Sequence, residues 1–296
     1  MIKYNLKTDK MSKLLIPIDF SEYSENAIRY ACQIATANGQ SIDLVHVFSW
    51  HSNSYLNNQE EATLNDPRVP EAEEQMERTI NWLSQEFPGI STQALFRNGN
   101  LYEEIKSLTN QTPYDAVVMG TDGASGLEAL FIGSNTYDTI LNTTTPVLAV
   151  PKSSQKFDKK HVGLLCNFKE AELSALEQAR PLLNDDYHLI LIHVNLNDRA
   201  INELDNEFKR WIERIETEID LSDISYVIKP QTLFAHQKES LPDAITAALI
   251  DEHVDFLVIT KSRKNIFRKL IQPNVVKKLA FSMRIPTFFA RVLIKK

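Results

Sequence analysis

The sequence is poor in cysteine, the residue that crosslinks small folds and binds structural metals. Its 296 residues include two cysteines, Cys32 and Cys166, and neither has a C-x-x-C partner or a histidine-rich neighbourhood. This pattern argues against a disulfide framework and against a zinc site. Because both cysteines lie inside apolar segments, we expect buried free thiols in a reducing compartment.

The sequence also lacks long apolar runs and an excess of positive charge. No apolar run reaches the roughly 18 residues of a membrane-spanning helix, and the polar start of the chain has no apolar core of a secretory signal. We therefore expect a cytoplasmic protein without a membrane partner. The net charge of -7 argues against a nucleic acid, since phosphate-binding surfaces carry clustered lysine and arginine. A small ligand or a protein partner is favoured.

The remaining composition is that of an ordinary globular protein, with 43% hydrophobic and 24% charged residues. In the first half, short apolar runs alternate with amphipathic segments, which is typical of βαβ units and a parallel sheet. The expected strands cover residues 13–19, 42–48, 91–97, 115–120 and 146–151. We expect helices at residues 24–39 and 71–86, with a polar surface loop at residues 50–70 between the second strand and the second helix.

The second half repeats this pattern. Residues 113–120 match residues 252–260, and residues 143–150 match residues 283–290, both with an offset of 140 positions, from 120 to 260 and from 146 to 286. An internal duplication explains one shared offset. We expect two tandem, doubly wound, Rossmann-like α/β domains of five parallel strands each, at residues 1–151 and 161–296, joined by a linker at residues 152–160.

The last strand of each half is apolar and would lie at a sheet edge, where exposed strands promote aggregation. Pairing the two edges within one chain hides both. We therefore expect an intramolecular pseudo-dimer, and a homodimer of the whole chain is left open.

Half of the chain's eight glycines lie between Gly120 and Gly133. In an open parallel sheet, ligands bind beyond the carboxyl ends of the strands, where Asp19, Val47 and Gly120 are expected. Glycine lets the backbone approach a ligand closely, and the helix that begins near Gly133 and Ser134 offers free N–H groups to a phosphate. The alternative is that the glycines only form a connection and Ser134 only caps its helix. The spacing matches neither the P-loop nor G-x-G-x-x-G.

Three stretches together are similar to one known family. Gly120-x2-Gly123-x9-Gly133-Ser134 after a buried strand, followed by "TTPVLAVP", resembles the universal stress protein family, as do "PIDFSEYSENAI" and "DLVHVF" earlier in the first half. The resemblance extends to the second half through the internal repeat. It implies an adenine nucleotide alpha hydrolase-like fold, in which some members bind ATP with a divalent ion and others bind no nucleotide.

Transferred residue by residue, the resemblance implies a site for ATP or another adenine nucleotide, with Mg²⁺ or Mn²⁺. Asp19 would meet the ribose or adenine, and the backbone of Val47 would contact adenine. The residues that would surround the ribose and the phosphates are Gly120, Gly123, Gly133 and Ser134, and Asn135, next in the helix, would add an amide.

Two acidic residues, Asp122 and Glu128, depart from the family pattern, because many nucleotide-binding members carry a basic residue in this loop. A carboxylate repels a phosphate by about 1 kcal/mol at 4 Å in water, and several-fold more near a protein surface. Either a metal ion offsets this repulsion, or the acids point to solvent, or the ligand carries less phosphate, as AMP does.

The second half departs further. At the equivalent positions it has Asn167 for Asp19, Thr260 for Gly120, and Arg263, Pro273 and Asn274 for the remaining motif residues. We therefore expect no second nucleotide. The basic stretch from Lys261 to Lys269 would bind an anion or an acidic partner, or it is simply a solvated surface.

No nucleophile–base arrangement is visible, and we interpret His46 and His193 as structural histidines. The main hypothesis is a nucleotide-binding regulator or sensor of the stress response, with ligand in the first domain only and little or no turnover. The alternative is an interaction or scaffold protein that needs no nucleotide. A weak ATPase that depends on Asp19 is the third hypothesis.

Overall fold

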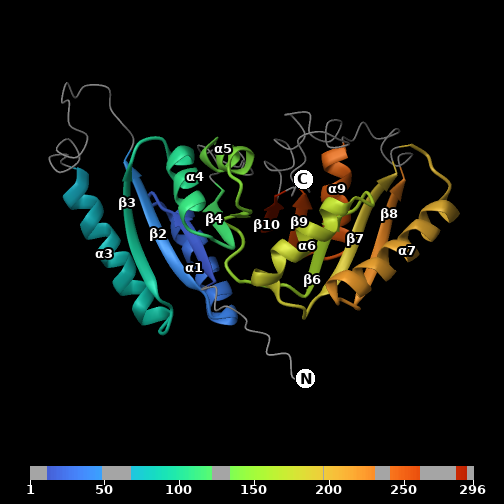
Figure 1. Ribbon diagram of the computed structural model, residues 1–296, viewed down its shortest axis with the longest axis horizontal. Coiled ribbons are helices and arrows are strands. Elements are labelled where there is room, and N and C mark those ends of the chain that lie inside the picture. The colour runs from blue at the N-terminus through green and yellow to red at the C-terminus, as the bar shows by residue number, and fades with distance from the viewer. Residues whose placement is uncertain are drawn as a thin grey trace, which may run out of the picture.

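The computed structural model describes residues 12–48, 68–121, 134–195, 197–230, 241–260 and 285–291. The first-half strands are β1 (Lys13–Pro17), β2 (Ser41–Phe48), β3 (Thr92–Asn98), β4 (Ala116–Gly120) and β5 (Val147–Val150). The second-half strands are β6 (His161–Leu165), β7 (His188–Asn195), β8 (Ile224–Pro230), β9 (Phe256–Thr260) and β10 (Thr287–Ala290). Within the described residues they form one 10-stranded sheet in the order β3-β2-β1-β4-β5-β10-β9-β6-β7-β8 (Figure 1).

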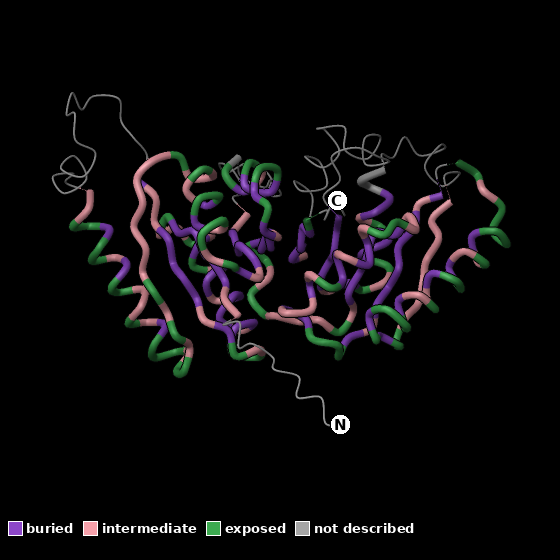
Figure 2. Tube along the Cα trace, in the orientation of Figure 1, coloured by how far each residue is buried: buried purple, intermediate pink, exposed green. Residues whose placement is uncertain are grey.

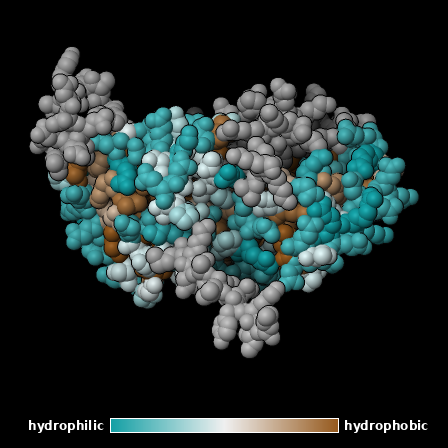
Figure 3. All heavy atoms as spheres, viewed as in Figure 1, coloured by the Kyte–Doolittle hydropathy of each residue, from teal (hydrophilic) through white to brown (hydrophobic). Residues whose placement is uncertain are grey.

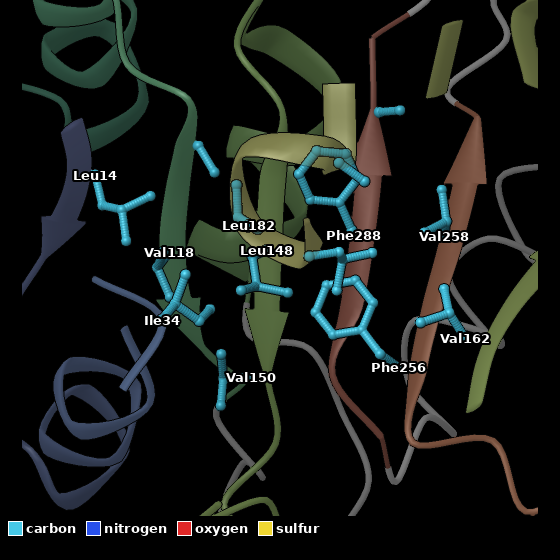
Figure 4. Close-up of a cluster of buried hydrophobic side chains, with 14 of the residues drawn as sticks. Leu14, Ile34, Val118, Leu148, Val150, Val162, Leu182, Phe256, Val258 and Phe288 are labelled. Atoms are coloured by element: carbon cyan, nitrogen blue, oxygen red, sulfur yellow. The ribbon is translucent and has the colours of Figure 1, made fainter. Parts of the chain in front are cut away.

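The two halves meet at the centre of this sheet. β5 and β10 pair antiparallel, with Phe288 opposite Leu148, whereas the pairs within each half are parallel. Both side chains belong to one buried cluster that spans the junction (Figure 4). The predicted pseudo-dimer is therefore confirmed: the two apolar edges cover each other and leave β3 and β8 at the ends of the sheet.

Helices cover both faces of the sheet. One face carries α1 (Glu22–Asn38), α3 (Arg68–Glu86), α6 (Glu170–Leu183) and α7 (Ile201–Ile219); the other carries α4 (Leu101–Gln111), α5 (Ser134–Asn142) and α9 (Leu241–Asp251). Alternate strand residues point to opposite faces and contribute to two separate core clusters, each of which includes residues of both halves. The inner strands are accordingly buried between the helix layers, whereas the edge strands β3 and β8 are mostly half-buried (Figure 2).

Two helix starts show how local sequence sets the boundaries. The side chain of Ser21 accepts a hydrogen bond from the backbone N–H of Ser24 and caps α1, which ends at Gly39 with a left-handed φ of 66°. The prediction for α3 was wrong by one turn, because α3 begins at Arg68 and not at residue 71. Pro70 fits in this first turn, where backbone N–H groups have no helical acceptor anyway.

The two halves share their strand order and their local hydrogen bonds. The carboxylate of Asp115 accepts from the backbone N–H of Lys13 at 3.1 Å, and Asp255 accepts from His161 at 3.0 Å. The stretch at residues 152–160 lies on α1, since Gln33 bonds the backbone carbonyl of Gln155 and the backbone N–H of Phe157. The connection between the halves is thus fastened to the first half.

The interior and the surface agree with the composition. Cys32 and Cys166 are buried and unpaired, as predicted, and burial raises the pKa of Cys32 to about 12. The surface seen in Figure 3 is mainly hydrophilic, with apolar atoms showing beside α3 at the left end. None of the helices in the described part of the chain is both long and apolar enough to span a membrane.

Candidate nucleotide site at the carboxyl edge of the first half

The strand order brings three of the predicted site residues to one edge of the sheet. β2, β1 and β4 are neighbours and parallel, so their carboxyl ends lie side by side. Asp19 follows β1, Val47 lies near the end of β2, and Gly120 ends β4. Residues that are far apart in the sequence therefore surround the point where the strand order reverses, which is the usual ligand position in this architecture.

Asp19 is an exposed carboxylate in a tight turn. Its Oδ1 accepts hydrogen bonds from the backbone N–H of Ser21 at 3.1 Å and from the Ser21 hydroxyl at 2.6 Å. Partial burial alone would raise the pKa of Asp19, but the hydrogen bonds from the hydroxyl and the backbone N–H of Ser21 outweigh it and lower the pKa below its ordinary value. Asp19 is therefore ionised at neutral pH and is a hydrogen-bond acceptor, suited to a ribose hydroxyl or an amino group.

His46 supports this turn from the neighbouring strand. Its Nδ1 lies 2.9 Å from the carbonyl oxygen of Ile18, which can only accept, so Nδ1 carries the hydrogen. The ring of Phe20, which has a φ of 62°, stacks on His46 with 4.8 Å between the ring centroids. In the second half, His193 donates to the carbonyl of Cys166 in the same way. The interpretation of both histidines as structural residues is confirmed.

The backbone of Val47 points towards the open end of β1. The carbonyl of Val45 accepts from the N–H of Ile18 on the β1 side, while the carbonyl of Phe48 accepts from Gly99 on the β3 side. Successive residues of a strand alternate sides, so Val47 faces the same side as Val45. The registered pairing of β2 with β1 stops at Val45, so the polar backbone groups of Val47 lie beyond it.

Gly120 is required here for a reason that the sequence did not indicate. A Cβ at this position would lie 2.4 Å from the backbone oxygen of Tyr23, in the first turn of α1. No side chain fits at that distance, so glycine is needed for α1 to pack against the end of β4. A role of Gly120 in ligand binding stays a prediction.

The start of α5 is fastened to the same strand end. Ser134 is the first residue of α5, and the hydroxyl of Thr136 donates to the carbonyl of Gly120 at 3.0 Å. The sequence analysis did not identify Thr136. Its place in the first turn of α5, two residues after Ser134, is the feature that could have indicated it. Asn135 is exposed. Gly123, Gly133, Asp122 and Glu128 lie outside the described residues.

The second half keeps this frame but changes the side chains. Asn167 takes the place of Asp19, and Thr260 ends β9 as a buried residue where Gly120 ends β4. The buried carboxylate of Glu172, at the start of α6, accepts from the backbone N–H of Asn167 at 2.7 Å. Arg263, Pro273, Asn274 and the basic stretch from Lys261 to Lys269 lie outside the described residues.

The fold and the edge together define the class: doubly wound α/β domains with a ligand edge at the strand-order reversal. Residues 11–151 match the model of the universal stress protein family. Two universal stress proteins of Methanocaldococcus jannaschii are each 26% identical, over 48% and 49% of this chain and 96% and 84% of their own lengths.

A universal stress protein structure from Archaeoglobus fulgidus covers 97% of this chain and 98% of its own, with a TM-score of 0.68 and 17% identity. At that identity the likeness shows the fold, and it extends over both halves. The first half of the chain, residues 11–151, belongs to the universal stress protein family.

Proposed function

We propose that the first half of the chain binds an adenine nucleotide, ATP or AMP, and that bound nucleotide acts as the signal of a stress-response regulator. The family match covers this half, and the observation that carries the proposal is the meeting of Asp19, Val47 and Gly120 at the ends of three adjacent strands. The domain limits at residues 151 and 161, the cytoplasmic location and a homodimer of the whole chain stay predictions.

The chemistry of the edge suits a nucleoside. The Val47 N–H and carbonyl offer one donor and one acceptor to the edge of an adenine ring, as a neighbouring strand would. Asp19, held by Ser21, accepts hydrogen bonds from the ribose hydroxyls or the adenine amino group. The first turn of α5 supplies backbone N–H groups and a partial positive charge, which attract phosphate.

A divalent ion bound with ATP would neutralise phosphate charge beside Asp122 and Glu128. Among the described residues, no group of three or more His, Cys, Asp or Glu side chains is arranged to hold a metal ion. Mg²⁺ with nucleotides usually takes its ligands from the phosphates, water and one or two carboxylates.

Titration calorimetry of the full chain with ATP and AMP, each with and without Mg²⁺, tests the proposal. We expect binding of at least one nucleotide and a loss of about tenfold or more in affinity for Asp19→Ala, because a hydrogen bond to a charged group contributes about 1.5–3 kcal/mol. Gly123→Val is expected to reduce binding by steric obstruction. Absence of heat with every adenine nucleotide would contradict the proposal.

The alternative function, a scaffold that needs no nucleotide, is favoured by one observation: the second half keeps the fold with Asn167 and Thr260 in place of the site residues. It predicts that purified protein carries no nucleotide and that partners bind equally well after replacement of Gly133 and Ser134. The weak ATPase predicts phosphate release that disappears in Asp19→Ala.

A further inference from the structure

The helices on one face of the sheet match between the halves with two different offsets. In α1 the buried residues Ala27, Ala31 and Ile34 recur in α6 148 positions later, at 175, 179 and 182. In α3 the buried residues at 72, 76 and 83 recur in α7 132 positions later, at 204, 208 and 215. A residue of α1 therefore corresponds to the residue of α6 that is 148 positions later, and a residue of α3 corresponds to the residue of α7 that is 132 positions later.

A groove of about 290 Å³ lies between α1 and α3. It is lined by side chains that are mainly apolar or hydroxyl-bearing: Ile18, Phe20, Ser21, Ser24, Glu25, Ile28, Gln75, Arg78, Thr79 and Trp82. This volume is just below the roughly 300–1,000 Å³ range of small-molecule pockets. The groove therefore suits a molecule smaller than a nucleotide.

In the second half, larger side chains stand at two of these positions. The counterpart of Ser24 is Glu172, with 2% of its surface exposed, and the counterpart of Thr79 is Trp211, with 6% exposed. The Trp211 ring lies 6.2 Å from the ring of Phe168, which corresponds to Phe20. The second half thus places an indole ring against the aromatic residue that, in the first half, lines the open groove.

We infer that the groove between α1 and α3 is a second ligand site, for a neutral, planar aromatic molecule that carries an N–H or O–H donor. The side chain of Trp211 is the protein's own example of the planar aromatic ring, and its buried indole N–H has no hydrogen-bond partner among the described residues. Phe20 and Trp82 provide aromatic surfaces, and Ile18 and Ile28 provide an apolar floor.

The preference for a donor follows from the hydroxyl groups. Ser24 donates its hydrogen to the carbonyl of Ser21, and Thr79 donates to the carbonyl of Gln75, so both oxygens keep acceptor capacity. The two charged lining residues are paired within the protein, Glu25 with Arg29 and Arg78 with Glu74. A neutral ligand therefore leaves these ion pairs intact.

The groove is separate from the proposed nucleotide site. It lies on the face covered by α1 and α3, whereas α5 packs on the opposite face. Phe20 and Ser21, which line the groove, are next to Asp19 in the chain, so competition with ATP is a direct test of separateness.

Saturation-transfer NMR with indole and the full chain tests the site. We expect a signal with a Kd on the order of 1 mM, as is usual for a ligand of this size. Thr79→Trp fills the groove as Trp211 does in the second half and should remove the signal. Gln85→Trp adds the same side chain at an exposed position of α3 and should leave the signal unchanged.

A second measurement needs no variant. Amide shifts of ¹⁵N-labelled protein should change at Ser24, Thr79 and Trp82 on addition of indole, and not at Glu172 or Trp211. No signal with the unmodified chain, an equal signal with Thr79→Trp, or shifts elsewhere would overturn the inference. Displacement of indole by ATP would show that the groove is part of the nucleotide site and would also overturn it. The ATP calorimetry is read separately, so either proposal can fail alone.

Discussion

The two halves of the molecule share one frame and differ in where they keep a carboxylate. In the first half, the exposed Asp19 follows β1 and the small Ser24 lies in the first turn of α1. At the equivalent positions of the second half, Asn167 follows β6 and the buried Glu172 lies in the first turn of α6. The exposed carboxylate has a lowered pKa, and burial raises the pKa of Glu172 to about 7, against the hydrogen bonds that it accepts from the backbone. The same edge thus leaves its carboxylate exposed in one half and buries it in the other.

The largest expected effect concerns the strand junction that both halves share. Phe288→Ala removes a fully buried ring opposite Leu148 and should lower the free energy of unfolding by about 4 kcal/mol, the usual cost of an uncompensated core cavity. Urea unfolding measures this loss. Leu141→Ala, at an exposed position of α5, is the control and should change stability by less than about 0.5 kcal/mol. Equal effects would mean that the junction contributes little.

The buried carboxylate of Glu172 predicts that stability depends on pH in the range near neutrality. Glu172 has a pKa of about 7 in the folded chain and an ordinary value of 4.5, so between these values the folded state binds more protons than the unfolded state. Stability therefore falls as pH rises from about 4.5 through 7, by about 3 kcal/mol from this residue.

Glu172→Gln removes this titration and keeps an oxygen for the N–H of Asn167. The difference in unfolding free energy between the native chain and the variant should therefore change by about 2.5 kcal/mol between pH 5 and pH 8. Urea unfolding at both values measures it. A difference that is the same at the two pH values would show that burial does not raise the pKa of Glu172.

The third prediction compares alanine substitutions at the last residues of β4 and β9, Gly120 and Thr260. Gly120→Ala places a Cβ against the backbone of Tyr23 and should cost about 2 kcal/mol, because α1 must move. Thr260→Ala shortens a side chain that the second half already accommodates and should cost about 1 kcal/mol. If both variants have the same thermal stability, the close approach of α1 is not what requires glycine.

The sequence was sufficient for the strands, the order of the halves and the central pairing, since short apolar runs, apolar last strands and the offset of 140 shared by the last two strands of each half indicate them. It was not sufficient for Gly120, because no pattern shows that the backbone of Tyr23 lies against it. Glu172 was missed because a glutamate in the first turn of an amphipathic helix is ordinarily exposed.

The counterpart of Thr79 could not be found from the sequence either. The offset between the halves changes from 148 at α1 and α6 to 132 at α3 and α7, because the connection before α3 is longer than the one before α7. Only the buried residues of the two folded helices establish that Thr79 corresponds to Trp211.

Native mass spectrometry of the full chain with saturating ATP and with AMP tests the central claim, that one half binds a nucleotide and the other does not. The account predicts one nucleotide per chain, lost in Asp19→Asn, which installs the second-half residue, and retained in Asn167→Asp. No bound nucleotide, or two per chain, would contradict it.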